Sequence, residues 1–253
     1  MMKQEDLGRL YNTYSVVARC ERTGEFGAGV ASAVPAVGAT CLQMRAGLGA
    51  VSTQSWTNPY LATAILDALA DGADAAAAVA QAVAADPAAA YRQVGAISAA
   101  GLGAAHTGAQ CTAWCGHVEG DDFAVQGNML TDGNVLDAMA EAVAPKDLPL
   151  EERLMRSLEG AQRVGGDKRG RQSAAIAVIG TEDYRRVDLR VDEHSDPIAE
   201  LRRVFTIATA QLAPFVAGMP QRGATAEGAP DHVVEMLLKS PPDRPGSGGS
   251  RVP

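Results

Sequence analysis

The sequence predicts an α+β fold in which two antiparallel sheets pack together and are covered by pairs of helices. Strand-like and helix-like segments come in separate blocks along the 253 residues, whereas parallel α/β sheets alternate strand with helix. The hydrophobic content of 47% with 21% charged residues is typical of a globular protein. Aromatic residues make up only 4%, so Ala, Val, Leu and Ile must form most of the core.

The first block begins with a β-hairpin. Thr13–Arg19 and Gly27–Ser32 are rich in small and β-branched residues, and the polar turn between them contains Gly24. A second strand-like pair, Ala36–Met44 and Gly47–Gln54, follows. The hairpin opens on a hydroxyl residue, Thr13, that stands directly behind a polar leader.

Two helices come next. Asn58-Pro59 predicts a helix start, because Asn caps free N–H groups and Pro suits the first turn. This helix should end near Ala70, and a second should run over Ala73–Ala85 until Asp86-Pro87 stops it. Further strands are expected over Tyr91–Ser98, Gly103–His106, Phe123–Gly127, Ser173–Ile179 and Arg185–Val191, and further helices over Asn134–Ala144, Leu150–Val164 and Pro197–Leu212.

The predicted organisation is a leader over residues 1–12, one domain over 13–215 and a disordered tail over 216–253. Pro, Gly and Ser dominate the tail, which leaves room for one or two helical turns at Asp231–Lys239. The leader carries charges without an apolar core, unlike a secretory signal. With no such signal, the four cysteines are expected to be reduced thiols in the cytoplasm.

Charge and hydropathy exclude two classes of partner. The formal net charge is -8 and no basic stripe is present, which argues against nucleic acid. No stretch approaches the roughly 20 apolar residues of a membrane helix. Cys111, Cys115 and His117 lie close in sequence, but no second pair of ligands suits zinc, so we expect buried thiols and no metal.

Thr13 is the main candidate for chemistry. A threonine at the head of a sheet becomes a nucleophile if its own α-amino group is freed to act as base. The alternative is an ordinary strand residue. The segment from Gly165 to Ser173 crowds charges and glycines into one turn. Asp167 and Ser173 could adjoin the reacting group there, and Arg169 or Arg171 could bind an anionic substrate. The alternative there is a solvated loop.

Three further segments carry candidates. Backbone amides near Gln54 and Ser55, before the helix capped by Asn58, could stabilise an oxyanion. Gln126 and Asn128 could bind a polar substrate, or belong to a turn. His106 could line the cleft, although a hydrogen-bonded structural histidine is favoured.

Taken together, several blocks resemble the domain-of-unknown-function family 1028, assigned to the N-terminal-nucleophile (Ntn) hydrolase-like superfamily. The blocks occur in order within about Thr13 to Leu212 and are Thr13–Arg19, Thr53–Pro59, Ala105–Gly108, Gln126–Leu130, Asp167–Ser173 and Val187–Asp192. No activity is firmly attached to this family. The resemblance implies a four-layer αββα sandwich, in which Thr13 begins the first hairpin as the nucleophile does in proteasome-type members.

The same resemblance assigns supporting roles. Asp167 and Ser173 are similar to the pair that supports the nucleophile. Arg45 stands about where the family's lysine lies and can only supply positive charge. Ser32 stands where the acidic partner would be.

We therefore expect an Ntn-type amidohydrolase that uses no cofactor and cleaves a small polar amide or a peptide after Asn12-Thr13 is cut. The catalytic residues would be Thr13, Arg45, Asp167 and Ser173, with Gln54, Ser55, Asn58, His106, Gln126, Asn128 and Arg169 binding the oxyanion or substrate. The alternatives are a non-catalytic Ntn-fold protein, which binds a metabolite or serves as an assembly subunit, and a Cys111-dependent enzyme. A homodimer is a reasonable assembly.

Overall fold

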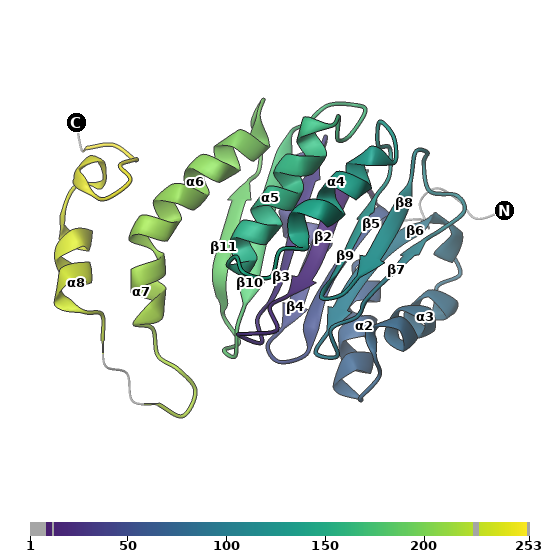
Figure 1. Ribbon diagram of the computed structural model, residues 1–253, viewed down its shortest axis with the longest axis horizontal. Coiled ribbons are helices and arrows are strands. Elements are labelled where there is room, and N and C mark those ends of the chain that lie inside the picture. Colours follow the sequence, from purple (N-terminus) through teal and green to yellow (C-terminus); the bar gives the residue numbers. More distant parts are fainter. Residues whose placement is uncertain (1–8, 12, 225–227, 252–253) are drawn as a thin grey trace. The chain divides into compact units, whose positions relative to one another are not determined.

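Figure 1 shows the computed structural model, which describes residues 9–11, 13–224 and 228–251. The chain divides into two compact units, Met1–Ile198 and Ala199–Pro253, and the first contains every described strand. The prediction of an α+β fold with two antiparallel sheets is confirmed.

The six-stranded sheet has the order β11-β10-β3-β2-β9-β8. Its strands are β2 (Thr13–Arg19), β3 (Phe26–Ser32), β8 (Gly116–Gly120), β9 (Phe123–Gly127), β10 (Ser173–Ile179) and β11 (Arg185–Val191). The predicted hairpin lies at the centre, with Thr13 opposite Ser32 and Arg19 opposite Phe26. The sequence did not predict β8, since its five residues are bounded by glycines and show little β-propensity.

The five-stranded sheet is built around β5 (Gly49–Thr57). One side of β5 pairs with β6 (Arg92–Ser98), which in turn pairs with β7 (Gly103–Thr107). The other side pairs with β4 (Leu42–Arg45) along its first half and with β1 (Arg9–Tyr11) along its last residues.

The strand expected over Ala36–Met44 is only half correct. A short helix, α1 (Gly38–Cys41), replaces its first part, and β4 forms the rest. The backbone N–H of Val37 donates to the hydroxyl of Ser173, 3.1 Å away. This contact joins residues far apart in sequence, so local propensity could not predict the helix.

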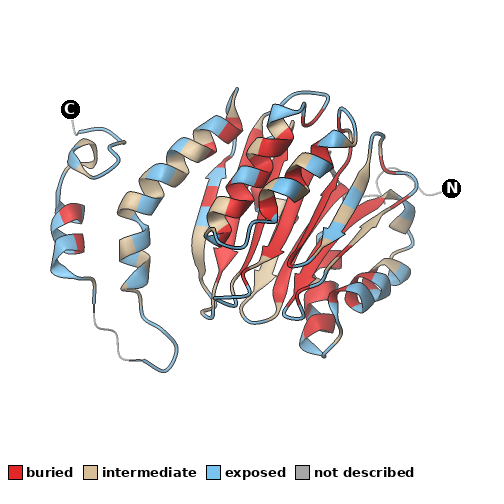
Figure 2. Cartoon of the chain, viewed as in Figure 1, coloured by how far each residue is buried: buried red, intermediate tan, exposed pale blue. Residues whose placement is uncertain are grey.

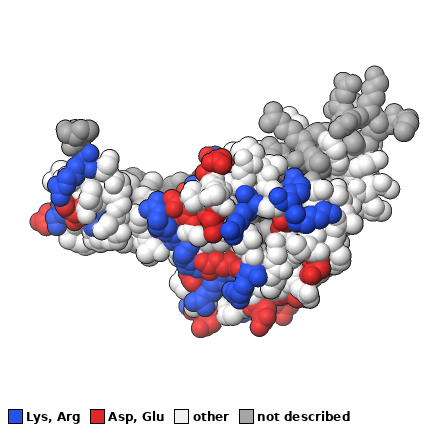
Figure 3. All heavy atoms as spheres, turned by 90° about the horizontal axis from the view of Figure 1, so that it is seen from above, with Lys and Arg blue, Asp and Glu red and all other residues white. Residues whose placement is uncertain are grey.

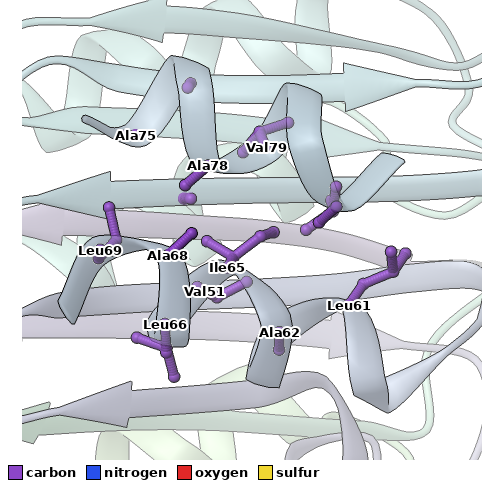
Figure 4. Close-up of a cluster of buried hydrophobic side chains, with 14 residues drawn as sticks. Val51, Leu61, Ala62, Ile65, Leu66, Ala68, Leu69, Ala75, Ala78 and Val79 are labelled. Carbon is purple, nitrogen blue, oxygen red and sulfur yellow. The ribbon is translucent and has the colours of Figure 1, made fainter. Parts of the chain in front are cut away.

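Helices α2 (Pro59–Ala70) and α3 (Ala75–Ala85) pack on the five-stranded sheet. The side chain of Asn58 accepts from the N–H of Tyr60 (3.1 Å), and Asp74 caps α3 in the same way through Ala77 (2.7 Å). Figure 4 shows the apolar side chains of both helices meeting Val51 of β5.

On the six-stranded sheet, α4 (Asn134–Val143) and α5 (Leu150–Arg163) pack against each other and against β2, β3 and β9. Arg153 of α5 is buried and donates to the backbone oxygens of Val143 (2.7 Å) and Arg19 (3.0 Å). It thereby satisfies carbonyls at the ends of α4 and β2.

The two sheets also contact each other, chiefly through β2 and β5, through β6 and β9, and through β7 and β8. Val17, Ala28 and Val30 of one sheet share an apolar cluster with Ala50 and Ile97 of the other. The strands at the centre of both sheets are therefore buried along most of their length (Figure 2).

Helix α6 (Pro197–Gln211) begins in the first unit and continues into the second. The second unit also contains α7 (Ala213–Ala217), α8 (Asp231–Leu238) and a 3-10 turn at Pro241–Asp243. Among the helices of the described ranges, none is long and apolar enough to cross a membrane.

Replacing Ile65 by Ala should lower the free energy of unfolding by about 2–5 kcal/mol, because it leaves a cavity in the cluster of Figure 4. Urea denaturation followed by circular dichroism measures this. The control on the same helix is Tyr60→Ala, whose side chain is 79% exposed. It should change stability by less than about 0.5 kcal/mol. Equal losses in the two variants would contradict the packing.

Candidate functional site

Four strands of the six-stranded sheet have their termini at the same end of the sheet, where β2 and β10 begin and β3 and β9 end. Thr13, Ser32 and Ser173 lie side by side there on adjacent strands, and all three are buried. Residues directly opposite in antiparallel strands point to the same face. The hydroxyl of Thr13 donates to Oγ of Ser32 at 3.2 Å.

The described hydrogen bonds of the Ser173 hydroxyl go to the segment that follows β3. This hydroxyl donates to the carbonyl of Val34 (2.6 Å) and accepts from the N–H of Val37 (3.1 Å). Its described contacts therefore order the segment before α1.

A network of neutral side chains joins this end of the six-stranded sheet to the five-stranded sheet. Nε2 of Gln54, on β5, donates to the backbone oxygen of Thr13 (3.0 Å) and to Oε1 of Gln93 (2.8 Å). The hydroxyl of Ser15 donates to Oε1 of Gln54 (2.6 Å), and Nε2 of Gln126 donates to that hydroxyl (2.6 Å). The candidates Thr13, Gln54 and Gln126 are thus brought together.

Gln93 of β6 is the second centre of this network, and the sequence did not single it out. Its Nε2 donates to the carbonyl of Gly127 (2.8 Å) and to Oγ1 of Thr107 (2.9 Å). Nδ2 of Asn128 donates to Oε1 of Gln93 (2.8 Å), while the Asn128 N–H donates to the oxygen of Thr13 (3.0 Å). The available signal was a polar Gln at the start of a largely apolar strand, since a buried amide needs partners.

The network is tightly packed around Gly95. A β-carbon at this position would lie 2.0 Å from Oε1 of Gln126, so the Gln126 side chain occupies the space of the missing side chain. Oε1 of Gln126 and Oδ1 of Asn128 are buried and accept no hydrogen bond from the described part of the chain. Two acceptors are therefore left for a donor beyond these residues.

The side chains around Thr13 are neutral. Ser15, Ser32, Gln54, Gln93, Gln126 and Asn128 are all hydroxyl or amide residues, and each is buried. Within the described residues, His117 joins the network only through Thr107, whose Oγ1 lies 2.9 Å from the ring nitrogen Nδ1. These groups hold the Thr13 backbone and hydroxyl in place, but none of them is a strong base.

Asp167 and Arg169 pair with each other. Nη2 of Arg169 lies 2.6 Å from Oδ2 of Asp167, and Nε lies 3.1 Å from Oδ1. Asp167 also bridges to the backbone of Leu130, close to the end of β9. The loop that carries Asp167 therefore reaches the end of the sheet where Thr13 lies. The Asp167 carboxylate is bonded to Arg169 of the same loop.

Arg45 lies elsewhere, which corrects the expectation that it stands beside Thr13. It pairs with Gly49 at the start of β5, five residues before Gln54. At about 3.3 Å per residue this separates the two positions by about 16 Å. The guanidinium of Arg45 forms an exposed ion pair with Asp67, 2.7 Å away.

Asn58 and His106 have structural partners. Asn58 caps α2 and donates from Nδ2 to Asp86 (2.9 Å), which is also bonded by Nε of Arg92 (2.9 Å). Nε2 of His106 lies 3.0 Å from the carbonyl of Ala89. His106 is opposite Val94, which packs under α2 and α3, so it faces away from Gln93 and the network.

Ser55 has an unusual backbone. Its φ of +66° places a non-glycine residue in the left-handed region, within β5 and directly after Gln54. Such conformations are uncommon and concentrate at functional sites. The main chain of β5 is therefore distorted where the sequence suggested oxyanion donors.

Residues 13–201 match the family described as "Family of unknown function (DUF1028)". The chain belongs to this family. It is similar to the crystal structure of protein SPO2555 from Silicibacter pomeroyi, which carries the same family name, with 32% identity and a TM-score of 0.77. That match covers 83% of this chain and 92% of the other.

More distant matches are Anbu proteins. The Anbu (Gly-1) mutant from Hyphomicrobium sp. strain MC1 is 15% identical, and Anbu (ancestral beta-subunit) from Yersinia bercovieri is 13% identical. Both have a TM-score of 0.38 and cover 84% of this chain and 100% of the other, and so low a score supports no conclusion. None of the curated proteins matches.

The cysteines of this DUF1028 protein do not support a thiol enzyme. Burial raises the pKa of the Cys111 thiol, and a contact with Ser55 opposes this only in part. Burial also raises the pKa of Cys115. Both thiols therefore stay protonated at neutral pH. Across the described ranges, no three His, Cys, Asp or Glu side chains are grouped to hold a metal.

Surface charges pair with each other. Arg186 bonds Glu25 and Glu151, each at 2.6 Å, and Arg190 bonds Asp192 at 2.7 Å. On the face in Figure 3, basic and acidic side chains lie side by side. The buried neutral network, and not this charged face, is therefore the candidate site.

Replacing Gln93 by Leu should lower the free energy of unfolding by about 3 kcal/mol or more, because it leaves several buried amide groups without partners. Urea denaturation is again the measurement. Gln43→Leu on β4 is the matched control, since among the described residues that half-buried amide bonds only Pro59 and Thr63. It should cost less than about 1 kcal/mol. A Gln93→Leu variant as stable as the control would contradict the network.

The Asp86 carboxyl should make stability depend on acid pH. Burial opposes its ionisation, but hydrogen bonds from Asn58 and Arg92 outweigh burial and lower its pKa below the ordinary 3.8. Its contribution is therefore present above pH 3.8 and lost as the pH falls through the lower folded-state pKa.

We expect Asp86→Asn to destabilise the protein more at pH 7 than at pH 3, as measured by urea denaturation at both values. The exposed Asp71→Asn is the control and should show little difference between them. An Asp86→Asn effect that grows towards acid pH would contradict this assignment.

Proposed function

We propose that this DUF1028 protein is an amidohydrolase of the N-terminal-nucleophile type, with Thr13 as the nucleophile once the Asn12-Thr13 bond is cut. The observation that carries the proposal is the setting of Thr13. It begins a central strand, its hydroxyl bonds Ser32, and its backbone oxygen is held by Gln54 and Asn128. The family match begins at this same residue.

The neutral surroundings support a particular group as the base. A hydroxyl attacks an amide only if a base takes its proton. The described side chains around Thr13 are hydroxyls and amides, so the α-amino group of Thr13 is the base that the site needs. In the intact chain that nitrogen is part of a peptide bond and cannot accept a proton.

After cleavage, the reaction proceeds in two steps. Oγ1 of Thr13 attacks the substrate carbonyl, its proton passes to the α-amino group, and the leaving amine takes that proton as the C–N bond breaks. The product is an ester on Thr13. Water then hydrolyses this ester, releasing the carboxylic acid and restoring the hydroxyl.

Small polar amides or peptides are the substrate class. The unfilled acceptor Oδ1 of Asn128 suits an N–H donor of such a substrate, while Gln126 positions the hydroxyl of Ser15. The amides near Ser55 are the proposed oxyanion donors. Asp167 and Arg169 would adjoin the substrate, whereas Arg45, Asn58 and His106 have no part in the proposal.

The proposal also includes the layer arrangement of the fold and the cellular compartment. The packing of α2 and α3 on one sheet, and of α4 and α5 on the other, supports the four-layer αββα arrangement of Ntn hydrolases. All four cysteines are free thiols, which fits action in the reducing cytoplasm.

A non-catalytic role is the second candidate, and one observation favours it. In the intact chain Thr13 has no exposed surface, and its hydroxyl and carbonyl are both hydrogen-bonded. A chain that keeps its leader would therefore act by binding a partner or metabolite.

Mass spectrometry of the purified protein tests the proposal. We expect a chain that begins at Thr13: with a water molecule as the base, the Thr13 hydroxyl attacks the carbonyl of residue 12, the C–N bond breaks to leave an ester and a free α-amino group, and water hydrolyses the ester. Thr13→Ser keeps a hydroxyl and should also lose residues 1–12, whereas the isosteric Thr13→Val should retain them. Retention of the leader in all three chains would refute the nucleophile. Loss of the leader in all three would point to a foreign protease.

A further inference from the structure

The outer edge of β5 is covered by two separate strands. β4 pairs with residues from Gly49 to Ser52, and β1 pairs with residues from Ser55 to Thr57. The register of β1 is Arg9 opposite Thr57, Leu10 opposite Trp56 and Tyr11 opposite Ser55. The last part of this edge is therefore closed by residues that precede Thr13.

This part of the edge needs a partner strand. Ser55 is fully buried and Thr57 is 3% exposed, although both lie on the outer side of the sheet's central strand. Buried backbone N–H and C=O groups are costly when unpaired. If β1 were removed, Ser55 to Thr57 would lose their pairing, and another extended chain would have to replace it.

The edge is also held in a fixed shape. Nη1 of Arg92 donates to the carbonyl of Trp56 at 2.6 Å, and Arg92 is itself held by Asp86. Ser55 keeps its left-handed backbone next to Gln54. A preformed edge reduces the ordering cost that an incoming peptide must overcome.

The direction of β1 relates this edge to Thr13. β1 runs antiparallel to β5, so its C-terminal end lies opposite Ser55, the neighbour of Gln54. Gln54 in turn bonds the backbone oxygen of Thr13. A peptide bound like β1 therefore runs towards Thr13, and its backbone ends at the candidate site.

We propose that the β5 edge from Ser55 to Thr57 is a binding site for an extended peptide, which Arg9–Tyr11 fill in the intact chain. Recognition would come from main-chain hydrogen bonds of an added strand. This site goes beyond the proposed function, because peptide binding requires no chemistry at Thr13. If Thr13 is the nucleophile, a peptide bound along this edge would be the substrate of Thr13, and the substrate class would be extended peptides.

The test uses the full chain with Thr13→Val, which lacks the hydroxyl needed for self-cleavage, and mass spectrometry verifies that the leader is present. In this background, Arg9→Pro and Leu10→Pro are introduced together. Adjacent residues of an antiparallel strand alternate in bonding to a given neighbour, so one of the two prolines must remove an N–H that β5 uses. The matched control carries Lys3→Pro and Gln4→Pro.

Two measurements follow, with a fluorescein-labelled synthetic peptide of residues 1–12 as the probe. Hydrogen exchange at Ser55–Thr57 should become at least tenfold faster in the Arg9/Leu10 variant and should slow again when the peptide is added. Fluorescence polarisation should give at least fivefold tighter binding to this variant than to the control. A probe with proline at positions 9 and 10 should not bind.

The proposal is overturned if exchange at Ser55–Thr57 is the same in both variants, or if the probe binds both equally or neither. Unchanged exchange in β2 and β3 establishes that the variant is folded. If it does not fold, Leu10→Pro and Arg9→Pro are tested singly, and one of the two must reproduce the effect. Because Thr13 is Val throughout, peptide binding can succeed while processing of the wild-type chain fails, and the reverse.

Discussion

The buried amide network between the sheets determines how the rest of the first unit can be arranged. Amide side chains lose their hydrogen bonds to water on burial, and only well-placed partners compensate for that loss. Gln54, Gln93 and Gln126 find these partners only if β2, β5, β6 and β9 keep their present register. An apolar interface would tolerate small shifts between the sheets, whereas this one does not.

The same network bears on the proposed chemistry of Thr13. It holds Thr13 firmly and surrounds it with groups that neither accept nor release protons near neutral pH. In the proposed mechanism, breaking one peptide bond creates the base and separates the strand that covers β5 from the rest of the chain. A single event would thus change both the chemistry and the accessibility of this edge.

Local signals in the sequence predicted much of the fold. The turn after Arg19, the Asn58-Pro59 helix start and the apolar run from Ser173 to Ile179 all correspond to observed elements. Features that depend on distant contacts were missed. These include α1, ordered by Ser173, and the strand formed by Arg9–Tyr11 on β5.

Spacing along the chain was also a poor guide to the site. Arg45 is close to Gln54 in sequence, yet the β4–β5 hairpin places it at the other end of the strand. Gln93 looked like one polar residue in an apolar segment, and only the pairing of the sheets reveals its five partners. Gly95 and Gln126 share one volume between them. A larger residue at position 95 therefore requires a smaller or displaced side chain at position 126, so relatives without Gly95 should also differ at position 126.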